Sequence, residues 1–398
     1  MVKYLKLILL RYFPGFAKRA YRKTREIEDR AYWSSLPSRV STISAKESNA
    51  KKPRLLIVIP PIEDSMAAFG PGAGNYHYEI LRSAQDRYGA GNVESHFIST
   101  GTPWEQECEE IATEITVKNF SHTLFYIESY ERKSNLWRWD ILASELAKGK
   151  SGITAIGFLT DGTYELHQLQ CSRFHEVYSN SIFVQIDVAP TDKYLKKGRL
   201  FGPTFLPISQ ESIKLIRDYL SKSKATERFE LSFIGKIYGY RKKIIGELTK
   251  SGMNVFVNPH RATNSDSQPG YLEYMDALRR SRFTINFARA NGTSQMQLKS
   301  RMLESALVGA VPLTDDGGLS VLVLPEEIPY IKFSSPAEIQ NVVDKSRDSF
   351  PTLTPGGYVG VAGEAKIDRL ASNHFWETLE KGLEESSLKV LPLNTFEI

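Results

Sequence analysis

Short apolar runs and amphipathic stretches alternate along most of the chain. Residues 54–61 form a mostly apolar run, which is typical of a buried parallel strand. A glycine-rich loop at 70–75 and an amphipathic stretch at 76–88 follow, and they predict a turn and a helix. The same alternation predicts further strands at 122–127, 153–159, 177–179, 182–184 and 202–207, and helices at 137–148 and 209–223. This order predicts a parallel, doubly wound sheet.

The alternation starts again near residue 229, after a Lys- and Ser-rich stretch that indicates a boundary. It predicts strands at 229–235, 254–257, 283–287 and 310–314, a turn and strand at 326–333, and helices from 241 to 248 and at 271–278, 299–308 and 336–343. Residues 351–364 read as a Pro/Gly-rich loop, and an apolar helical stripe runs from Ile367 to about Ser387. We therefore predict an α/β protein with two doubly wound domains, at 54–225 and 226–350, followed by a loop and a final helix at 351–398.

Residues 1–53 have a different pattern. Leu5, Ile8, Leu9, Tyr12 and Phe13 form one apolar stripe, and basic residues surround it. We predict a basic helical arm at 1–33 and a solvated linker at 34–53. The arm has two interpretations. It can lie on an anionic membrane surface with its cations at the headgroups, or it can pack on the body of the protein.

The charge distribution narrows the possible partners. The 398-residue chain has 51 Lys and Arg against 46 Asp and Glu, a net charge of +5. Eight basic and no acidic side chains fall in residues 1–25, so residues 26–398 carry a net charge of −3. This distribution argues against nucleic acid as a partner of the body. The only two cysteines, Cys108 and Cys171, favour a reducing compartment. We expect a cytoplasmic protein, with the arm as a means of peripheral attachment to the inner membrane surface.

Candidate catalytic residues of the first domain follow its predicted strands. His77 opens the helix after the glycine-rich loop, and its ordinary pKa suits a general base. Asp161 follows the strand at 153–159, at the sheet edge where α/β proteins bind ligands, and it is an alternative base or an orienting carboxylate. Each can equally be a helix-capping or surface polar residue.

Candidate phosphate-binding residues cluster in the second domain. Glycines let the backbone approach a ligand, exposed N–H groups at a helix start donate hydrogen bonds to phosphate oxygens, and Lys and Arg add charge-assisted donors. A carboxylate one turn further along can accept two ribose hydroxyls. The residues with these properties are Gly235, Lys236, Arg241, Asn291, Gly292, Lys299, Arg301 and Glu304. Alone, the last three can also form an ordinary charged helix face.

The order of these segments resembles the C-terminal domain of GT-B glycosyltransferases. The segments are F-x-G-K-x-x-x-x-R from Phe233, Ser281-Arg282-Phe283, and K-x-R-x-x-E-x-x-x-x-G-A-V-P-L from Lys299. The resemblance covers about residues 229–345. It implies two Rossmann-like domains that face a cleft, and a C-terminal crossover helix within 351–398 that returns to the first domain. It is nearest to spore-maturation-protein-like glycosyltransferases, with some exostosin-like features.

The resemblance implies roles for individual residues. It makes Glu304 the ribose-binding glutamate, and Lys236 and Arg241 the pair that holds the diphosphate. Many retaining members have a second glutamate eight positions earlier, where this chain has Met296. The sequence therefore does not choose between inverting and retaining chemistry.

The function expected from these features is transfer of a sugar from a nucleotide-diphosphate-sugar donor to a glycan or lipid-linked acceptor. No cofactor is expected, because the nucleotide-sugar is a co-substrate. No metal is expected either, because the seven histidines are scattered and no D-x-D occurs. A GT-B-like sugar-nucleotide epimerase and an inactive binding or scaffold protein of the same architecture are the alternatives.

Overall fold

The computed structural model describes the chain in segments. They are residues 54–61, 73–99, 101–127, 141–142, 145, 153–160, 171–172, 174–175, 178, 180–186, 200–224, 228–235, 237, 239–257, 270–289, 296–315, 323–324, 328–346 and 360–388. The predicted arm and linker, most of the predicted helix at 137–148 and most of the loop at 351–364 lie outside these residues; the described residues 141, 142 and 145 are helical.

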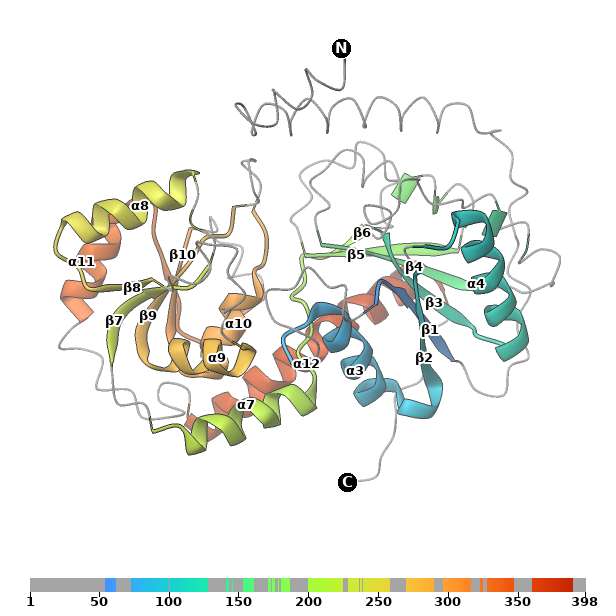
Figure 1. Ribbon diagram of the computed structural model, residues 1–398, viewed down its shortest axis with the longest axis horizontal. Coiled ribbons are helices and arrows are strands. Elements are labelled where there is room, and N and C mark those ends of the chain that lie inside the picture. Colours follow the sequence, from blue (N-terminus) through green and yellow to red (C-terminus); the bar gives the residue numbers. More distant parts are fainter. Residues whose placement is uncertain are drawn as a thin grey trace, which may run out of the picture.

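The first sheet is parallel and has helices on both faces (Figure 1). Its strands are β1 (Leu55–Ile59), β2 (Val93–Phe97), β3 (His122–Tyr126), β4 (Thr154–Leu159), β5 (Ser181–Gln185) and β6 (Leu200–Phe201), in the order β2-β1-β3-β4-β5-β6. Helix α4 (Trp104–Lys118) packs on one face, and α3 (Tyr76–Tyr88) packs on the other. The chain order reverses between β1 and β3, which makes this the topological switch point.

The second sheet repeats this plan. Its strands are β7 (Phe229–Phe233), β8 (Val255–Val257), β9 (Ser281–Asn286), β10 (Val311–Thr314) and β11 (Ile331–Lys332), in the parallel order β11-β10-β9-β7-β8. Helices α8 (Gly239–Lys250) and α11 (Pro336–Ser346) cover one face, and α9 (Tyr271–Arg279) and α10 (Ser300–Leu307) cover the other. The predicted fold class, α/β with two doubly wound Rossmann-like domains, is therefore confirmed.

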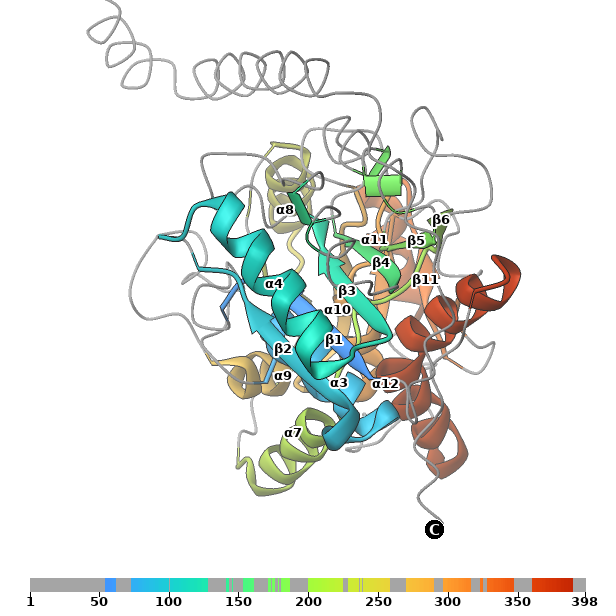
Figure 2. The ribbon, with the colours of Figure 1, turned by 90° about the vertical axis from the view of Figure 1, so that its right-hand side faces the viewer.

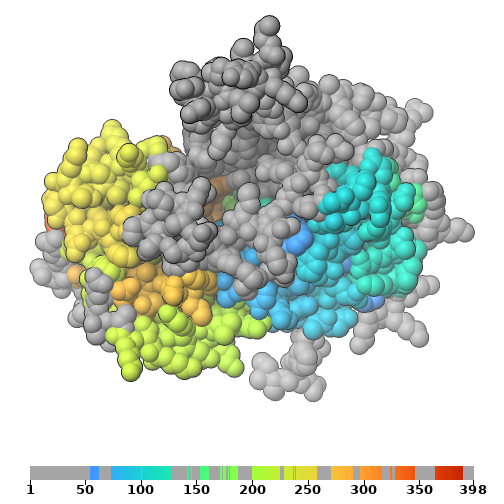
Figure 3. All heavy atoms as spheres, in the orientation of Figure 1, coloured from blue at the N-terminus to red at the C-terminus, as the bar shows by residue number. Residues whose placement is uncertain are grey.

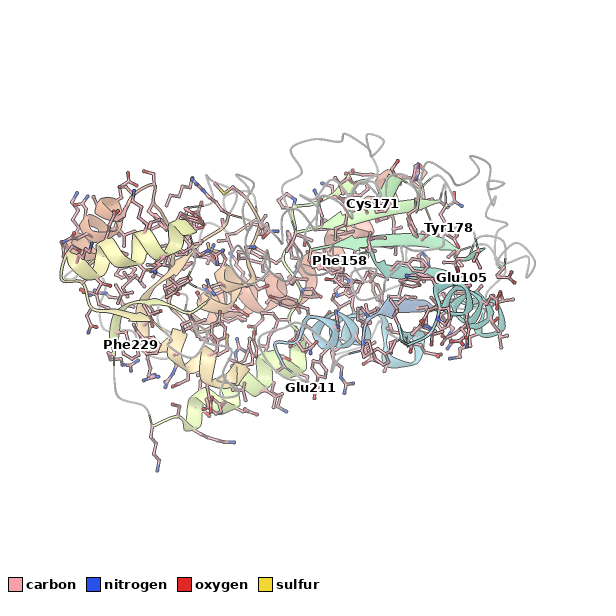
Figure 4. The ribbon with its side chains drawn as sticks, turned by 45° about the horizontal axis from the view of Figure 1, so that its top comes forward. Glu105, Phe158, Cys171, Tyr178, Glu211 and Phe229 are labelled. Atoms are coloured by element: carbon pink, nitrogen blue, oxygen red, sulfur yellow. The ribbon has the colours of Figure 1, made fainter. Side chains whose placement is uncertain are left out.

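Two helices pack across both domains (Figures 1 and 2). Helix α12 (Gly360–Glu385) contributes Ile367 and Ala371 to a core shared with α10, and its later turns pack under the first sheet. There, the ring of Phe375 meets Phe158 edge-on at 5.0 Å (Phe158 is labelled in Figure 4). Helix α7 (Gln210–Lys222) lies against α3 and α9. In Figure 3, atoms of α3, α7 and α9 form a continuous surface across this junction.

Several sequence-based element assignments were wrong. The pattern did not reveal β2, which is an edge strand with only one buried residue, nor α4, whose exposed face is rich in glutamate. Residues 202–207 are not a strand, because Pro203 and Pro207 cannot donate to a ladder. The C-terminal helix begins at Gly360, inside the predicted loop.

No helix in the described segments combines the length and the apolar character needed to cross a bilayer.

A partly buried histidine on α12 makes the free energy of unfolding depend on pH. Burial lowers the pKa of His374 to about 4, and its Nδ1 lies 2.8 Å from the Thr204 hydroxyl. In the unfolded chain this histidine becomes protonated near pH 6.5, whereas in the folded chain it stays neutral until about pH 4. Its contribution to the free energy of unfolding is therefore complete above pH 6.5 and is lost as the pH falls toward 4. We expect a loss of at most about 2 kcal/mol at pH 5 from this group. Urea unfolding at pH 7 and pH 5 should show a smaller drop for His374→Gln than for the wild type, and equal drops would contradict this assignment.

Candidate functional site

Two arginines of the second domain lie at the carboxyl ends of β7 and β9, the switch point of that sheet. Arg301, in the first turn of α10, donates a hydrogen bond from Nη2 to the Ile234 carbonyl, directly after β7. Arg241, in the first turn of α8, donates from Nη2 to the Arg289 carbonyl at 3.4 Å, just beyond β9. Open α/β sheets bind ligands at this position.

One aromatic pair supports both guanidinium groups. The rings of Phe233 and Phe287 meet edge-on with centroids 5.1 Å apart. The guanidinium of Arg301 lies 5.4 Å from the Phe233 centroid, and that of Arg241 lies 5.7 Å from the Phe287 centroid. Cation–π contacts of this kind hold guanidinium groups in place without neutralising them. The site therefore keeps its positive charge available to an anion.

A third arginine and one carboxylate complete this end of the sheet. Arg289 lies over the Tyr240 ring at 5.3 Å, and its Nε is 4.0 Å from Asp315. The Asp315 carboxylate also accepts hydrogen bonds from the Ala288 N–H (2.6 Å) and the Tyr240 hydroxyl (3.3 Å). Burial raises the pKa of Asp315, and burial together with Asp315 raises the pKa of Tyr240 to about 12. Asp315 directly follows the strand β10, and its carboxylate joins the end of that strand to Ala288 after β9 and to Tyr240 of α8.

Arg301 retains an unused donor. Its Nε is buried and has no hydrogen-bond partner among the described residues. Buried guanidinium N–H groups are costly to leave unpaired, and a ligand at the site is one way in which they become satisfied. Gly235 makes room for this side chain, because a Cβ at that position would lie 3.0 Å from the Arg301 Nη2. The Arg301 guanidinium thus lies directly against the backbone just beyond β7.

Glu304 lies one turn along α10 from Arg301 and is 9% exposed. The Tyr274 hydroxyl of α9 donates to its Oε2 at 2.6 Å, which fixes the carboxylate. Tyr271 lies nearby, and burial, followed by the charges of Glu304 and Glu79, raises its pKa well above the usual range. Tyr271 is therefore neutral, and the Tyr274 hydrogen bond holds Glu304 as an oriented acceptor.

The first domain places His77 at its own switch point. His77 is in the first turn of α3, and its Nδ1 lies 3.3 Å from the Pro61 carbonyl, two residues beyond β1. Its ring meets Tyr126, the last residue of β3, edge-on at 5.5 Å. The Asn75 side chain caps this helix by accepting from the N–H groups of residues 77 and 78. His77 is buried here, with 5% of its surface exposed.

The glycine-rich loop packs directly on the second domain. Gly74 has a φ of +81°, and a Cβ on it would lie 2.3 Å from the Tyr271 ring. Glu79 anchors the loop, because its carboxylate accepts hydrogen bonds from the Gly74 N–H (2.8 Å), the Ser209 N–H (2.7 Å) and the Ser212 hydroxyl (2.6 Å). Burial raises the pKa of Glu79, while these hydrogen bonds lower it. The loop thus joins the first helix to the residues around Glu304.

Substituting this glycine tests the loop contact. We expect Gly74→Ala to destabilise the fold by about 1–2 kcal/mol from the backbone conformation alone, and to push Tyr271 away from the loop. Gly91→Ala is the matched control, since Gly91 has no neighbouring atom within 4 Å of a new Cβ. Urea unfolding measures both variants. A Gly74→Ala chain as stable as the Gly91→Ala chain would contradict the close packing.

The structure brings three of the predicted site residues together at the carboxyl ends of β7 and β9, namely Gly235, Arg241 and Arg301. Glu304 lies one turn further along α10, and His77 lies separately, at the carboxyl end of the first sheet. Lys299 is the residue that precedes α10. Asp161, Lys236, Asn291 and Gly292 lie outside the described residues. The sequence analysis missed Tyr126, Thr160, Tyr274 and Gln297, which are neutral and form no recognisable spacing.

One group with metal-ligating side chains lies away from this site. The ligand atoms of His96, Glu107 and Glu110 lie within 4.8 Å of one another, on β2 and α4. Both ring nitrogens of His96 are already 2.9 Å from the carboxylates of Glu107 and Glu114. Burial lowers the pKa of His96, but these two hydrogen bonds raise it overall. The group is therefore explained as an ion-pair network that joins an edge strand to its helix.

Comparisons with known proteins give similarity at the level of architecture. No protein-family model matches the chain, and no curated protein matches it in sequence. Among solved structures, the chain is similar to Anabaena HepE in complex with UDP, with 8% identity, a TM-score of 0.47, and coverage of 83% of this chain and 99% of that chain.

Two further solved structures are similar to the chain, with comparable sequence identity and coverage. A UDP-forming α,α-trehalose-phosphate synthase from Burkholderia xenovorans has 10% identity and a TM-score of 0.48, with 83% and 100% coverage. The UDP-GlcNAc 2-epimerase from Methanocaldococcus jannaschii has 11% identity and a TM-score of 0.38, with 80% and 99% coverage. These likenesses concern the overall arrangement of two α/β domains and assign no activity to this chain.

Proposed function

We propose that this protein is a glycosyltransferase that uses a nucleotide-diphosphate-sugar donor and needs no metal ion. The observation that carries the proposal is the group at the carboxyl ends of β7 and β9. Arg301 and Arg241 rest there on one aromatic pair, the Arg301 Nε has no hydrogen-bond partner within the described segments, and Glu304 is fixed one turn away. Planar guanidinium groups suit a diphosphate, and an oriented carboxylate suits vicinal hydroxyls.

The proposal assigns a role to each residue of the donor site. The two guanidinium groups bind the diphosphate, with Lys236 and Lys299 as further cations and Gly235, Asn291 and Gly292 as sources of backbone donors. Glu304 accepts the ribose hydroxyls. These contacts also stabilise the charge that develops on the diphosphate as it leaves, which is the main electrostatic task of a metal-independent transferase.

The proposed catalytic step uses residues of both domains. In the inverting form, an acceptor hydroxyl oxygen attacks the anomeric carbon, the bond from that carbon to the diphosphate oxygen breaks, and the nucleoside diphosphate leaves with the bonding electrons. His77 takes the hydroxyl proton, with Asp161 as an alternative base or orienting carboxylate. In a retaining form, the leaving diphosphate itself takes this proton. The acceptor is a glycan or a lipid-linked sugar, and the basic arm at residues 1–33 would keep a cytoplasmic enzyme near a membrane-bound acceptor.

A nucleotide-release assay tests this function. The full chain is incubated with a panel of UDP-, GDP-, CDP- and dTDP-sugars, with and without glycan acceptors, and the released nucleotide and the sugar products are measured. We expect release from one nucleotide class, accelerated by an acceptor. Isomerised donor sugar would favour the epimerase, binding without turnover would favour the scaffold, and no interaction with any nucleotide would contradict the proposal.

A further inference from the structure

Residues 296–298 join the two domains through hydrogen bonds, immediately before α10. We call them the bridging segment. On the second-domain side, Met296 pairs with Arg289, and the Gln297 N–H donates to the Ala288 carbonyl at 2.9 Å. On the first-domain side, the Leu298 N–H donates to the Ile186 carbonyl at 3.1 Å, and the Gln297 side-chain amide donates to the Thr160 carbonyl at 3.2 Å. The carboxyl ends of both sheets therefore meet at three consecutive residues.

The first-domain partners of the segment lie beside the predicted catalytic groups. Thr160 directly follows β4, and its hydroxyl is 3.2 Å from the hydroxyl of Tyr126. The Tyr126 ring contacts His77. Asp161 is the next residue in the sequence after Thr160. Holding the Thr160 carbonyl thus fixes the end of β4 beside the contact between Tyr126 and His77.

The second-domain continuation of the segment carries the donor site. Lys299 follows it directly, and Arg301 lies in the first turn of α10. Gln297 itself is only 2% exposed, so its amide is shielded from water. A buried amide that lost its acceptor would cost about 1–3 kcal/mol, and a shift of the segment is therefore resisted.

We propose that Gln297 is a positioning residue, which holds the donor-binding helix in register with the catalytic end of the first sheet. This role rests on the proposed transferase function. Nucleotide binding uses residues of the second domain, whereas sugar transfer needs both domains in the correct register. Loss of the Gln297–Thr160 hydrogen bond should therefore reduce turnover and leave nucleotide affinity almost unchanged. A misplacement of about 1 Å at a reacting centre can cost about 100-fold in rate.

The test compares two variants of similar size. Gln297→Glu replaces the donating amide by an oxygen that repels the Thr160 carbonyl, and Gln297→Met removes the hydrogen bond while it keeps the volume. We measure nucleoside-diphosphate affinity by calorimetry, kcat and KM by nucleotide release, and melting temperature. We expect kcat to fall about 10- to 100-fold in both variants, with the nucleotide Kd within about twofold of the wild type. The exposed glutamine of α4 gives the control, Gln106→Met.

The outcomes separate this role from the proposed function. If both variants keep the wild-type kcat, the positioning role is overturned. Sugar transfer by the wild type still supports the transferase function in that case. Parallel losses of kcat, nucleotide affinity and melting temperature would show a purely structural side chain, and they also overturn it. A wild-type chain that neither binds nor releases nucleotide contradicts the proposed function, and the positioning role falls with it.

Discussion

We expect His77→Gln to lower kcat by about 10²–10⁴-fold, because a positioned general base contributes a factor of this size. The histidine lies at the switch point of the first sheet, beside the ends of β1 and β3. Glutamine keeps similar bulk and hydrogen-bonding capacity but cannot take up the proton. Since no donor contact comes from His77 in the proposed arrangement, the nucleotide Kd should stay within about twofold of the wild type. Nucleotide release and calorimetry measure the two quantities.

A second histidine provides the control for this experiment. His175 bonds through Nδ1 to the Ser181 hydroxyl at 2.8 Å, at the amino end of β5 and so at the opposite edge of the sheet. His175→Gln should leave kcat close to the wild type. If His77→Gln also keeps wild-type kcat, His77 is not the base. Asp161→Asn then becomes the decisive variant for the alternative base.

We expect Arg301→Met to weaken binding of the cognate nucleoside diphosphate by about 10- to 150-fold, the equivalent of a lost charge-assisted contact of about 1.5–3 kcal/mol. Methionine retains apolar contact with Phe233 but removes the guanidinium group. Binding of the corresponding nucleoside, which lacks phosphate, should change less than about twofold, because Arg301 serves the diphosphate. Calorimetric titration of both ligands isolates the phosphate contribution.

Arg280 is the matched control for this arginine. Its guanidinium lies 5.1 Å from the ring of Phe229, which is the first residue of β7, whereas Arg301 contacts Phe233, the last residue of that strand (Phe229 is labelled in Figure 4). It also forms a 3.2 Å ion pair with Asp276. Arg280→Met therefore removes a comparable cation–π contact away from the site and should leave nucleotide affinity unchanged. Equal losses in the two variants would mean that the Arg301 effect is one of folding, and would contradict its role in the site.

Most of the fold could be predicted because buried parallel strands are continuous apolar runs. The run at 54–61 contains β1, and the stretch at 76–88 is α3 in full. Edge strands lack a continuous apolar run. In β2 (Val93–Phe97), three consecutive polar residues, Glu94, Ser95 and His96, interrupt the apolar pattern that would have predicted a strand. Their pairing with β1 is determined by the neighbouring strand and by α4, which a local pattern does not contain.

The candidate site could be predicted only where charge reveals it. Arg241, Arg301 and Glu304 were found because their charges fall beside predicted strand ends and helix starts. Gln297 and Thr160 are neutral, and their hydrogen bond spans 137 positions of sequence. Such a contact forms only when both domains have folded and packed together, so no local spacing in the sequence indicates it.

The central claim is that the carboxyl end of the second sheet binds a nucleoside diphosphate through the Arg301 and Arg241 pair and Glu304. The most direct measurement is calorimetric titration of the full chain with UDP, GDP, CDP and dTDP and with their nucleosides, repeated with Glu304→Gln. We predict saturable one-to-one binding of one diphosphate, and a loss of affinity in Glu304→Gln for both that diphosphate and its nucleoside, since the carboxylate serves the ribose. No binding of any nucleoside diphosphate to the wild type, or undiminished binding to Glu304→Gln, would contradict the account.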